Sequence, residues 1–132
     1  MKTLSVRQPW AFHILNSGKD IENRSWRTRH RGWIAIHAST KVEQDEDVDL
    51  PRGVRRPKPD QLVTGANIGV VRVVDVVERR RSKWHLSGQL GWVLVSPRRL
   101  KKPIPCKGKL SLWQVPPGAV AQITKQLGRL KD

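Results

Sequence analysis

A valine-rich run at residues 68–77 sets the strongest limit on the architecture of this chain. β-Branched side chains favour extended backbone, because they lose rotamer freedom in a helix and pack well on a pleated surface. The run is apolar at odd and even positions alike, with Arg72 and Asp75 as interruptions. A strand that is apolar on both faces needs a covering layer on each side. We therefore predict a central or bulged strand inside a sheet.

Local patterns place a helix and several strands around this run. Residues 3–7 are predicted to form a strand, and residues 8–16 carry apolar side chains at the spacing of one helical face. Residues 33–39 alternate as strands do, with every second side chain toward a core. The other predicted elements are a polar strand at residues 19–24, strands at 91–95 and 109–114, and a final helix at 116–127. This order predicts an α+β fold, a mixed β-barrel with flanking helices, rather than a parallel α/β sheet.

The chain length of 132 residues predicts a single domain over residues 1–132, with a basic, proline-containing loop around residues 51–62. The one cysteine, Cys106, has no partner for an internal disulfide, which suits a reducing compartment. No apolar stretch approaches the roughly 18 residues of a membrane span, and the first residues lack a signal-like pattern. We therefore expect a cytoplasmic protein without a membrane partner.

Charge is the first indication of function. The chain has 26 lysines and arginines against 11 acidic residues, a formal net charge of +15. Such an excess attracts polyanions, and phosphate backbones are the commonest of these because binding releases condensed counterions. Acidic membrane or protein surfaces, a merely solvated surface and adaptation to high temperature are the alternatives. The planar fork of arginine suits bidentate phosphate contacts. The arginines predicted to hold phosphates are Arg27, Arg29, Arg31, Arg55, Arg56, Arg79, Arg80 and Arg81.

Six tryptophans, with no tyrosine and one phenylalanine, dominate the aromatic residues. Trp10, Trp92 and Trp113 lie within apolar patterns, which favours a position in the core. Trp26 and Trp84 lie in charged segments where no neighbour in the sequence would bury them. An indole flanked by cationic side chains suits base stacking and cation–π contact. These two rings are predicted to face a ligand, and the alternative is that they close one end of the barrel.

The segment after the predicted helix holds the most informative polar side chains. Glu22 and Arg24 share a face of the predicted strand and Lys19 stands at its start, so a carboxylate would lie between two cations that it orients. Arg7 and Gln8 lie at the preceding strand-to-helix junction, where they offer hydrogen bonds to the polar edge of a base. The alternative is an ordinary exposed strand whose surface ion pairs contribute little to the stability of the fold.

Histidine and cysteine do not indicate a metal site. The four histidines lack the spacing of metal ligands, and the lone Cys106 does not complete a set. His37 lies on the side of its predicted strand away from the core. There it either lines a pocket or forms its hydrogen bonds within the protein. The chain has no phosphate-binding glycine loop, dinucleotide fingerprint or nucleophile elbow. No metal and no cofactor are therefore predicted.

Several segments, in this order, resemble the ASCH domain family of the PUA-like superfamily. The N-terminal ones are residues 4–11 (LSVRQPWA), 18–26 (GKDIENRSW) and 31–39 (RGWIAIHAS). The later ones are residues 69–75 (GVVRVVD), 91–94 (GWVL), 103–108 (PIPCKG) and 112–113 (LW). The resemblance implies a small PUA-like β-barrel and a cleft between the barrel and the first helix. It also implies a role in RNA processing, translation or the recognition of modified bases.

The same resemblance implies a possible enzyme. Some family members are amidohydrolases that deacylate N4-acetylcytidine, and others are reported as ribonucleases. In the amidohydrolase branch a lysine, a threonine and a glutamate act; Lys19 matches the lysine, whereas Glu22 occupies the threonine position. The hydroxyl nucleophile of that branch is therefore missing, and no glutamate aligns within residues 78–90. If the chain is an enzyme, Lys19 would polarise a carbonyl or act as a base, and Glu22 would act on a water.

Two functional hypotheses follow. The first is a module that binds nucleic acid, RNA more than DNA, or a modified nucleotide, with an unpaired base in a cationic cleft. The second is a small hydrolase acting on N4-acylated cytidine or on RNA. A nucleoside carries no phosphate, so an enzyme for nucleosides alone leaves the net charge unexplained. The residues predicted to contact a base or other ligand are Arg7, Gln8, Trp10, Lys19, Glu22, Arg24, Trp26, His37 and Trp84.

Overall fold

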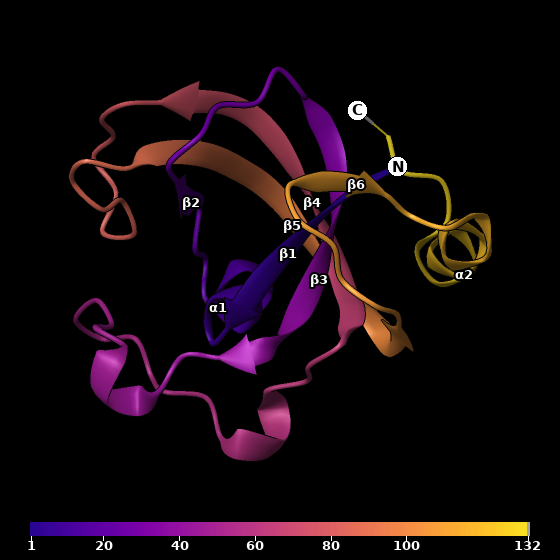
Figure 1. Ribbon diagram of the computed structural model, residues 1–132, viewed down its shortest axis with the longest axis horizontal. Helices are drawn as coiled ribbons and strands as arrows, with labels where there is room; N and C mark the ends of the chain where they lie inside the picture. The colour runs from indigo at the N-terminus through magenta and orange to yellow at the C-terminus, as the bar shows by residue number, and fades with distance from the viewer. Residues whose placement is uncertain (132) are drawn as a thin grey trace.

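The valine-rich run forms strand β4 (Ala66–Val77) in the computed structural model, which describes residues 1–131. This strand lies inside a six-stranded, strongly curved sheet (Figure 1). The other strands are β1 (Lys2–Gln8), β2 (Ile21–Arg24), β3 (Gly32–Val42), β5 (Leu90–Pro105) and β6 (Leu112–Gln114). The helices are α1 (Trp10–Asn16) and α2 (Pro117–Leu127), with short 3₁₀ turns η1 (Asp45–Asp47) and η2 (Pro59–Gln61).

The strands are ordered β2-β5-β4-β3-β1-β6, and only the β1–β3 pair among them is parallel. This mixed sheet with two helices confirms the predicted α+β class. The central position of β4 is also confirmed, and its pairing with β5 shifts register at three points, as a bulged strand does. Within residues 1–131 the ladder ends at β2 and β6 without closing, so the expected barrel is not confirmed.

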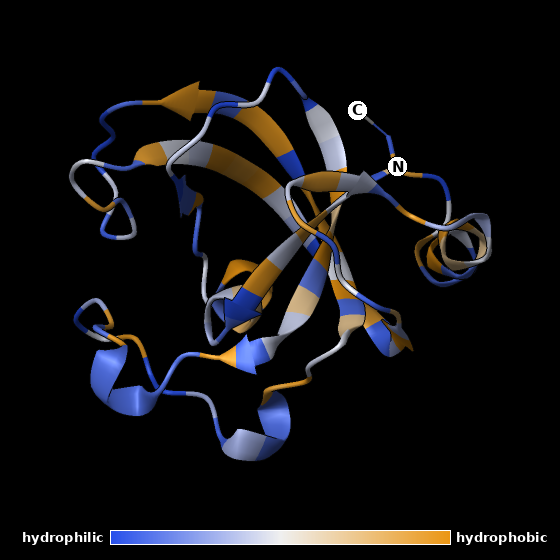
Figure 2. Cartoon of the chain, viewed as in Figure 1, coloured by the Kyte–Doolittle hydropathy of each residue, from blue (hydrophilic) through white to orange (hydrophobic). Residues whose placement is uncertain are grey.

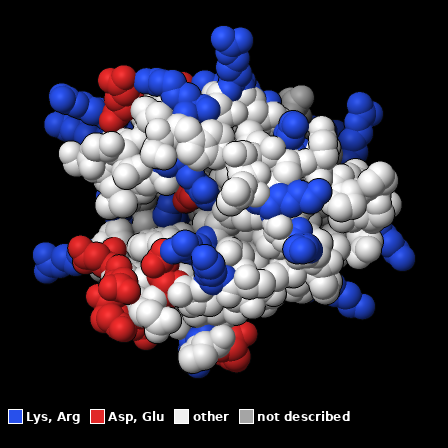
Figure 3. Space-filling model, viewed as in Figure 1, with Lys and Arg blue, Asp and Glu red and all other residues white. Residues whose placement is uncertain are grey.

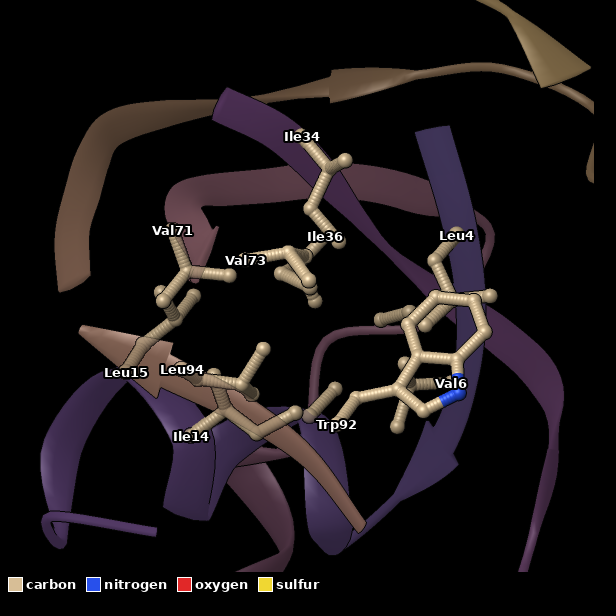
Figure 4. Close-up of a cluster of buried hydrophobic side chains, with 12 residues drawn as sticks. Leu4, Val6, Ile14, Leu15, Ile34, Ile36, Val71, Val73, Trp92 and Leu94 are labelled. Atoms are coloured by element: carbon tan, nitrogen blue, oxygen red, sulfur yellow. The ribbon is translucent and has the colours of Figure 1, made fainter. Parts of the chain in front are cut away.

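The main core fills the concave side of the sheet. Helix α1 packs there against β1, β3, β4 and β5 and contributes Ile14 and Leu15 (Figure 4). Trp92 on β5 is fully buried among these side chains, as its apolar pattern predicted. Burial of an aliphatic or aromatic side chain of this size contributes about 1.5–3 kcal/mol. Figure 2 shows the corresponding distribution, with apolar residues along the central strands and α1 and hydrophilic residues in the loops.

A second cluster covers the opposite face of the sheet. Ala35 on β3 and Val70 on β4 are fully buried there beneath Ala119 and Ile123 of helix α2. Because Ile36 of β3 and Val71 of β4 belong to the main core, both strands carry buried side chains on both faces. Helix α2 therefore supplies the second covering layer that the doubly apolar pattern requires.

Strand β5 differs most from its expected form. Residues 91–95 were expected as a strand, but β5 continues to Pro105 and includes four basic residues within 98–102 (RRLKK). The extension is stabilised by pairing with β4, where Gly69 lies opposite Arg99 and Asn67 opposite Ile104. Pairing between strands that are distant in the sequence leaves no local pattern. The prolines and basic residues after position 95 therefore looked like a loop in the sequence. Neither helix within residues 1–131 has the length and apolar character that crossing a bilayer requires.

Candidate functional site

A cavity of about 1300 Å³ opens on one face of the molecule. It is lined by the C-terminal part of β1, the start of α1, β2 with residues 25–26 that follow it, and the end of β3, together with three more distant loops. The loop residues come from 47–51, 83–89 and 106–110, which lie far apart in the sequence. Figure 3 shows the hollow, with basic and acidic atoms inside it and an acidic group along one side. The tertiary fold thus brings the N-terminal segments and three distant loops to one site.

Three charged side chains form the floor of this cavity. The Glu22 carboxylate accepts from Lys19 Nζ at 3.2 Å through Oε1 and from Arg24 Nε at 2.8 Å through Oε2. Lys19 also donates to the Ile21 carbonyl, and Arg24 Nη2 donates to the Ser5 carbonyl at 2.8 Å. Lys19 and Glu22 are only 4% and 6% exposed. The floor therefore holds two cations and one anion in a fixed geometry with little solvent.

Tryptophan rings form part of the wall. Trp10 is half-buried, and Lys19 Nζ lies 5.8 Å from the centroid of its ring. Trp26 is also half-buried, and it meets the buried Trp92 edge-to-face at 4.7 Å between centroids. The Trp92 indole N–H donates to the Trp26 carbonyl at 3.2 Å, which holds this loop in place. Trp26 is thereby supported by Trp92 while its side chain still borders the cavity.

Trp84 also lines the cavity, but the expectation that nothing would bury it is wrong. The residue is 4% exposed and packs with Ile21 and Val93. Its loop is tied to β2 because Asn23 Nδ2 donates to the Trp84 carbonyl and Asn23 Oδ1 accepts from Leu86 N, both at 2.9 Å. These contacts join residues about sixty positions apart, so the charged sequence around Trp84 gave no sign of them.

Gln8 does not line the cavity and is fully buried. Its amide nitrogen donates to the Val63 carbonyl, and its amide oxygen accepts from Phe12 N, both at 2.8 Å. The second bond satisfies one of the free amide groups at the start of α1. Both ends of the amide are thus occupied within the protein, in contrast to the base contact expected from the sequence.

The rim of the cavity carries charges of both signs. Arg7, Lys41, Lys83, Lys107 and Lys109 supply the cations. Three acidic side chains lie on the same rim, and one of them, Glu43, accepts from Arg7 Nη1 at 3.2 Å. The other two are Asp47 and Asp49. Lysines of the 106–110 segment and this acidic group were not among the predicted site residues, because only the tertiary fold brings them to β1 and β2.

The arginines predicted to hold phosphates lie outside the large cavity. Arg27, Arg29 and Arg31 surround a separate hollow of about 570 Å³ beside Val76. Arg27 is paired with Glu78 at 2.9 Å. Weaker pairs join Arg31 to Asp75 at 3.9 Å and Arg56 to Asp45 at 3.7 Å. Arg55, Arg79, Arg80 and Arg81 are exposed and line neither hollow. Their contact with phosphate stays a prediction.

A serine and a histidine face each other across two neighbouring strands at the cavity wall. Ser5 on β1 and His37 on β3 are register partners, and Ser5 Oγ lies 3.1 Å from His37 Nδ1. His37 Nε2 lies 2.8 Å from the Cys106 carbonyl, which can only accept. These partners assign the proton of the neutral ring to Nε2, so that Nδ1 accepts from the Ser5 hydroxyl. The His37 ring also packs edge-to-face on Trp113.

The titratable groups near the site offer no obvious metal ligand set. Among residues 1–131, no cluster of three or more His, Cys, Asp or Glu side chains has the arrangement of a metal centre. Burial raises the pKa of the Cys106 thiol, which favours the neutral form. The cavity lining carries ammonium, guanidinium, carboxylate, imidazole, hydroxyl and thiol groups.

Comparison with known proteins agrees with the family resemblance of the sequence motifs. The family model described as the ASCH domain matches residues 4–104. Activating signal cointegrator 1 of Homo sapiens is 27% identical over 126 residues, and the Mus musculus protein of the same name is 25% identical over 126 residues. Each alignment covers 85% of this chain but 22% of the relative, so the chain spans about a fifth of the length of these relatives.

Proposed function

Because this chain belongs to the ASCH domain family, we propose that it binds nucleic acid, RNA more than DNA, and holds an unpaired or modified base in its large cavity. The observation that carries the proposal is the ion-pair cluster of buried Lys19 and Glu22 with half-buried Arg24, which forms the floor of a cavity bordered by tryptophan rings. Preorganised donors and an acceptor beside aromatic walls are what recognition of an unpaired base requires.

The size of the cavity supports a ligand larger than a free base. Small-molecule sites commonly enclose about 300–1,000 Å³, and this cavity is about 1300 Å³. A base with its sugar and adjoining phosphates would occupy such a space. In this arrangement Trp26 stacks on the base, the floor cluster meets its polar edge, and the rim lysines contact phosphates. The net charge of +15 would draw the polymer to the site.

The finer features of the proposal concern the rest of the chain. We propose that the open, curved sheet corresponds to a PUA-like barrel and that the whole chain, with its basic loop at residues 51–62, is one domain. Helix α2 and β6 lie outside the matched region, yet β6 pairs with β1 and α2 packs on β5. A cytoplasmic location is likewise part of the proposal.

Binding is favoured over hydrolysis by Lys19 and Glu22. The Lys19 ammonium donates to two acceptors, and the Glu22 carboxylate accepts from two cations. An ammonium group has no lone pair with which to act as a base, while its third N–H and the remaining lone pairs of the carboxylate stay available to the polar edge of a ligand. Such a network orients a ligand without being consumed in any exchange of protons.

Fluorescence anisotropy with a labelled single-stranded RNA of about 12 nucleotides tests the proposal, beside DNA of the same sequence and a duplex. Trp26→Ala should weaken RNA binding by about 1–3 kcal/mol, the usual contribution of one stacked base. Trp33→Ala is the matched control, because Trp33 packs with the helix α2 cluster on the other face of the sheet. If the chain bound none of the three nucleic acids, or if both variants lost the same amount of affinity, the proposed site would be contradicted.

Salt dependence separates the rim lysines from the predicted arginines. Replacing Lys107 and Lys109 together by alanine should make the salt dependence weaker. The negative slope of log affinity against log salt should lose about one to two in magnitude, because each phosphate contact releases counterions. The matched variant replaces Arg79 and Arg81, which lie outside the cavity. A slope that changes only in the arginine variant would place the nucleic acid elsewhere on the molecule.

A further inference from the structure

We propose that Ser5 is a nucleophile toward carboxylic acyl donors and that His37 is its general base. The pair lines the large cavity, yet nothing in nucleic-acid binding requires a hydroxyl activated by an imidazole. The inference goes beyond the proposed function and does not depend on it, since acyl transfer to Ser5 needs the cavity but no bound polymer.

The geometry has the three parts of an activated nucleophile. Ser5 Oγ lies 3.1 Å from His37 Nδ1, within reach for proton transfer. His37 Nε2 donates to the Cys106 carbonyl at 2.8 Å, which fixes the tautomer that leaves Nδ1 free to accept. His37 is 1% exposed and packs against Trp113, so the ring does not turn away. Nucleophile, base and orienting acceptor thus form one chain of hydrogen bonds.

A glycine lies directly against this pair. A Cβ at Gly108 would lie 2.9 Å from Ser5 Oγ, 2.9 Å from His37 Nδ1 and 2.7 Å from His37 Cε1. Any side chain there would force the hydroxyl or the ring to shift, because real Cβ atoms do not approach so closely. Gly108 therefore lets the 106–110 segment pass over the pair, while Ser5 and His37 both remain on the cavity wall.

The cavity also holds cations suited to the charge that develops during acyl transfer. Arg24 donates to the Ser5 backbone carbonyl at 2.8 Å, and Lys19 lines the same floor. Fixed cations near the reacting carbonyl stabilise a negatively charged tetrahedral intermediate without having to reorient as solvent must. A carbonyl orients His37 but supplies no negative charge to stabilise the imidazolium, so the reaction should be slower than in a serine–histidine–carboxylate triad.

The reaction has two balanced halves. Ser5 Oγ attacks the acyl carbon as His37 Nδ1 takes the hydroxyl proton, and the bond from the acyl carbon to the leaving group breaks as that group receives the proton from His37. Water then attacks the acyl-serine while His37 takes its proton. The carboxylic acid leaves, and Ser5 regains its hydroxyl proton from His37. No oxidant, metal or further co-reactant is needed.

A second serine–histidine pair in the chain provides the matched control. Ser17 Oγ lies 2.7 Å from His13 Nδ1, a shorter distance than in the Ser5 pair. Neither Ser17 nor His13 lines the cavity. Hydrogen bonding alone therefore predicts reaction at Ser17, whereas the proposal predicts it at Ser5.

The test treats the full chain with a biotinylated fluorophosphonate, which phosphonylates activated serines with loss of fluoride, and locates the adduct by peptide mass spectrometry. We expect an adduct on Ser5 that is lost in Ser5→Ala and retained in Ser17→Ala. His37→Gln should slow labelling by about 10² to 10⁴-fold, the usual contribution of general-base catalysis. Ser5-dependent release of 4-nitrophenolate from 4-nitrophenyl acetate should follow the same pattern.

Thermal unfolding of each variant shows whether it is folded, and RNA anisotropy on the same samples keeps the two proposals separate. A folded wild-type chain that gives no adduct on Ser5 overturns the inference, as does an equal labelling rate in His37→Gln. Adducts found only at other serines would also overturn the inference. Labelling of Ser5 without RNA binding would support the nucleophile and contradict the binding function.

Discussion

The two serine–histidine pairs form nearly the same hydrogen bond in opposite surroundings. Ser5 and His37 join two strands at the wall of an open cavity, and both ring nitrogens have partners. Ser17 and His13 join one turn at the end of α1, and His13 Nε2 is buried without a partner. The His13 ring instead lies among the aromatic rings of Trp10, Phe12 and Trp84.

The two imidazole rings have different roles because their surroundings differ. Burial, and secondarily the charge of Lys19, lowers the pKa of His13 from 6.5 to about 4, so that this ring is neutral near pH 7. Its contribution is packing within an aromatic cluster. His37 faces a cavity and has a neighbour on each nitrogen, the arrangement that proton transfer uses. A hydrogen bond between serine and histidine is not enough for nucleophilic catalysis. A ligand must also be able to reach the hydroxyl, and the second ring nitrogen needs a hydrogen-bond partner.

Lys19 stands between the two pairs, and its buried charge should give the largest effect. Its backbone N–H donates to the His13 carbonyl, while its side chain lies on the cavity floor against Glu22. Glu22→Ala should lower the free energy of unfolding by about 3–5 kcal/mol, because it leaves a buried cation without its partner. Urea unfolding measures this. Glu78→Ala is the control, since that exposed pair with Arg27 contributes about 0–1 kcal/mol. Equal losses would show that the floor is hydrated.

Acidification should separate the two histidines at the next level of effect. The unfolded chain takes up a proton at His13 near pH 6.5, whereas the folded chain does so only near pH 4. The associated stability is therefore complete above about pH 6.5 and is lost as the pH falls toward 4, by about 3 kcal/mol. Urea unfolding at a series of pH values tests this. In His13→Leu the fall over that range should flatten, and an unchanged fall would assign it to other groups.

The smallest effects should come from the serine hydroxyls. Ser17→Ala leaves both nitrogens of a buried ring unpartnered and should lower the free energy of unfolding by about 1–3 kcal/mol. Ser5→Ala should cost less than about 1 kcal/mol, because a cavity water replaces the hydroxyl at His37 Nδ1. Thermal and urea unfolding compare the two variants directly. A larger loss for Ser5→Ala would give the Ser5–His37 pair a mainly structural role.

Elements whose evidence is local were predictable. The doubly apolar run at β4, the helical face of α1, the final helix and the alternating β3 strand all follow from side-chain periodicity. The order of charges at Lys19, Glu22 and Arg24 was equally visible, because these residues lie within six positions of one another at the start of β2. Long-range features were not predictable in this way. The extension of β5 and the burial of Trp84 depend on β4 and β2, which no local window contains.

The candidate site was only partly predictable for the same reason. The N-terminal residues of the cavity belong to segments that are close in the sequence. Gly108 and the carbonyl of Cys106 reach Ser5 and His37 from about seventy to a hundred positions away. Gln8 illustrates the opposite error, since a polar side chain at a junction looked free but holds α1 and the Val63 segment together.

By itself the sequence determined the excess of positive charge, the α+β class and the short motifs of the family, because each depends on composition or on neighbouring residues. The tertiary structure alone decided which polar groups face the cavity, which tryptophans are buried and which of two serine–histidine pairs has access to a ligand. Those properties depend on the distance and solvent exposure of groups joined by strand pairing across the whole chain. No local pattern of residues records them.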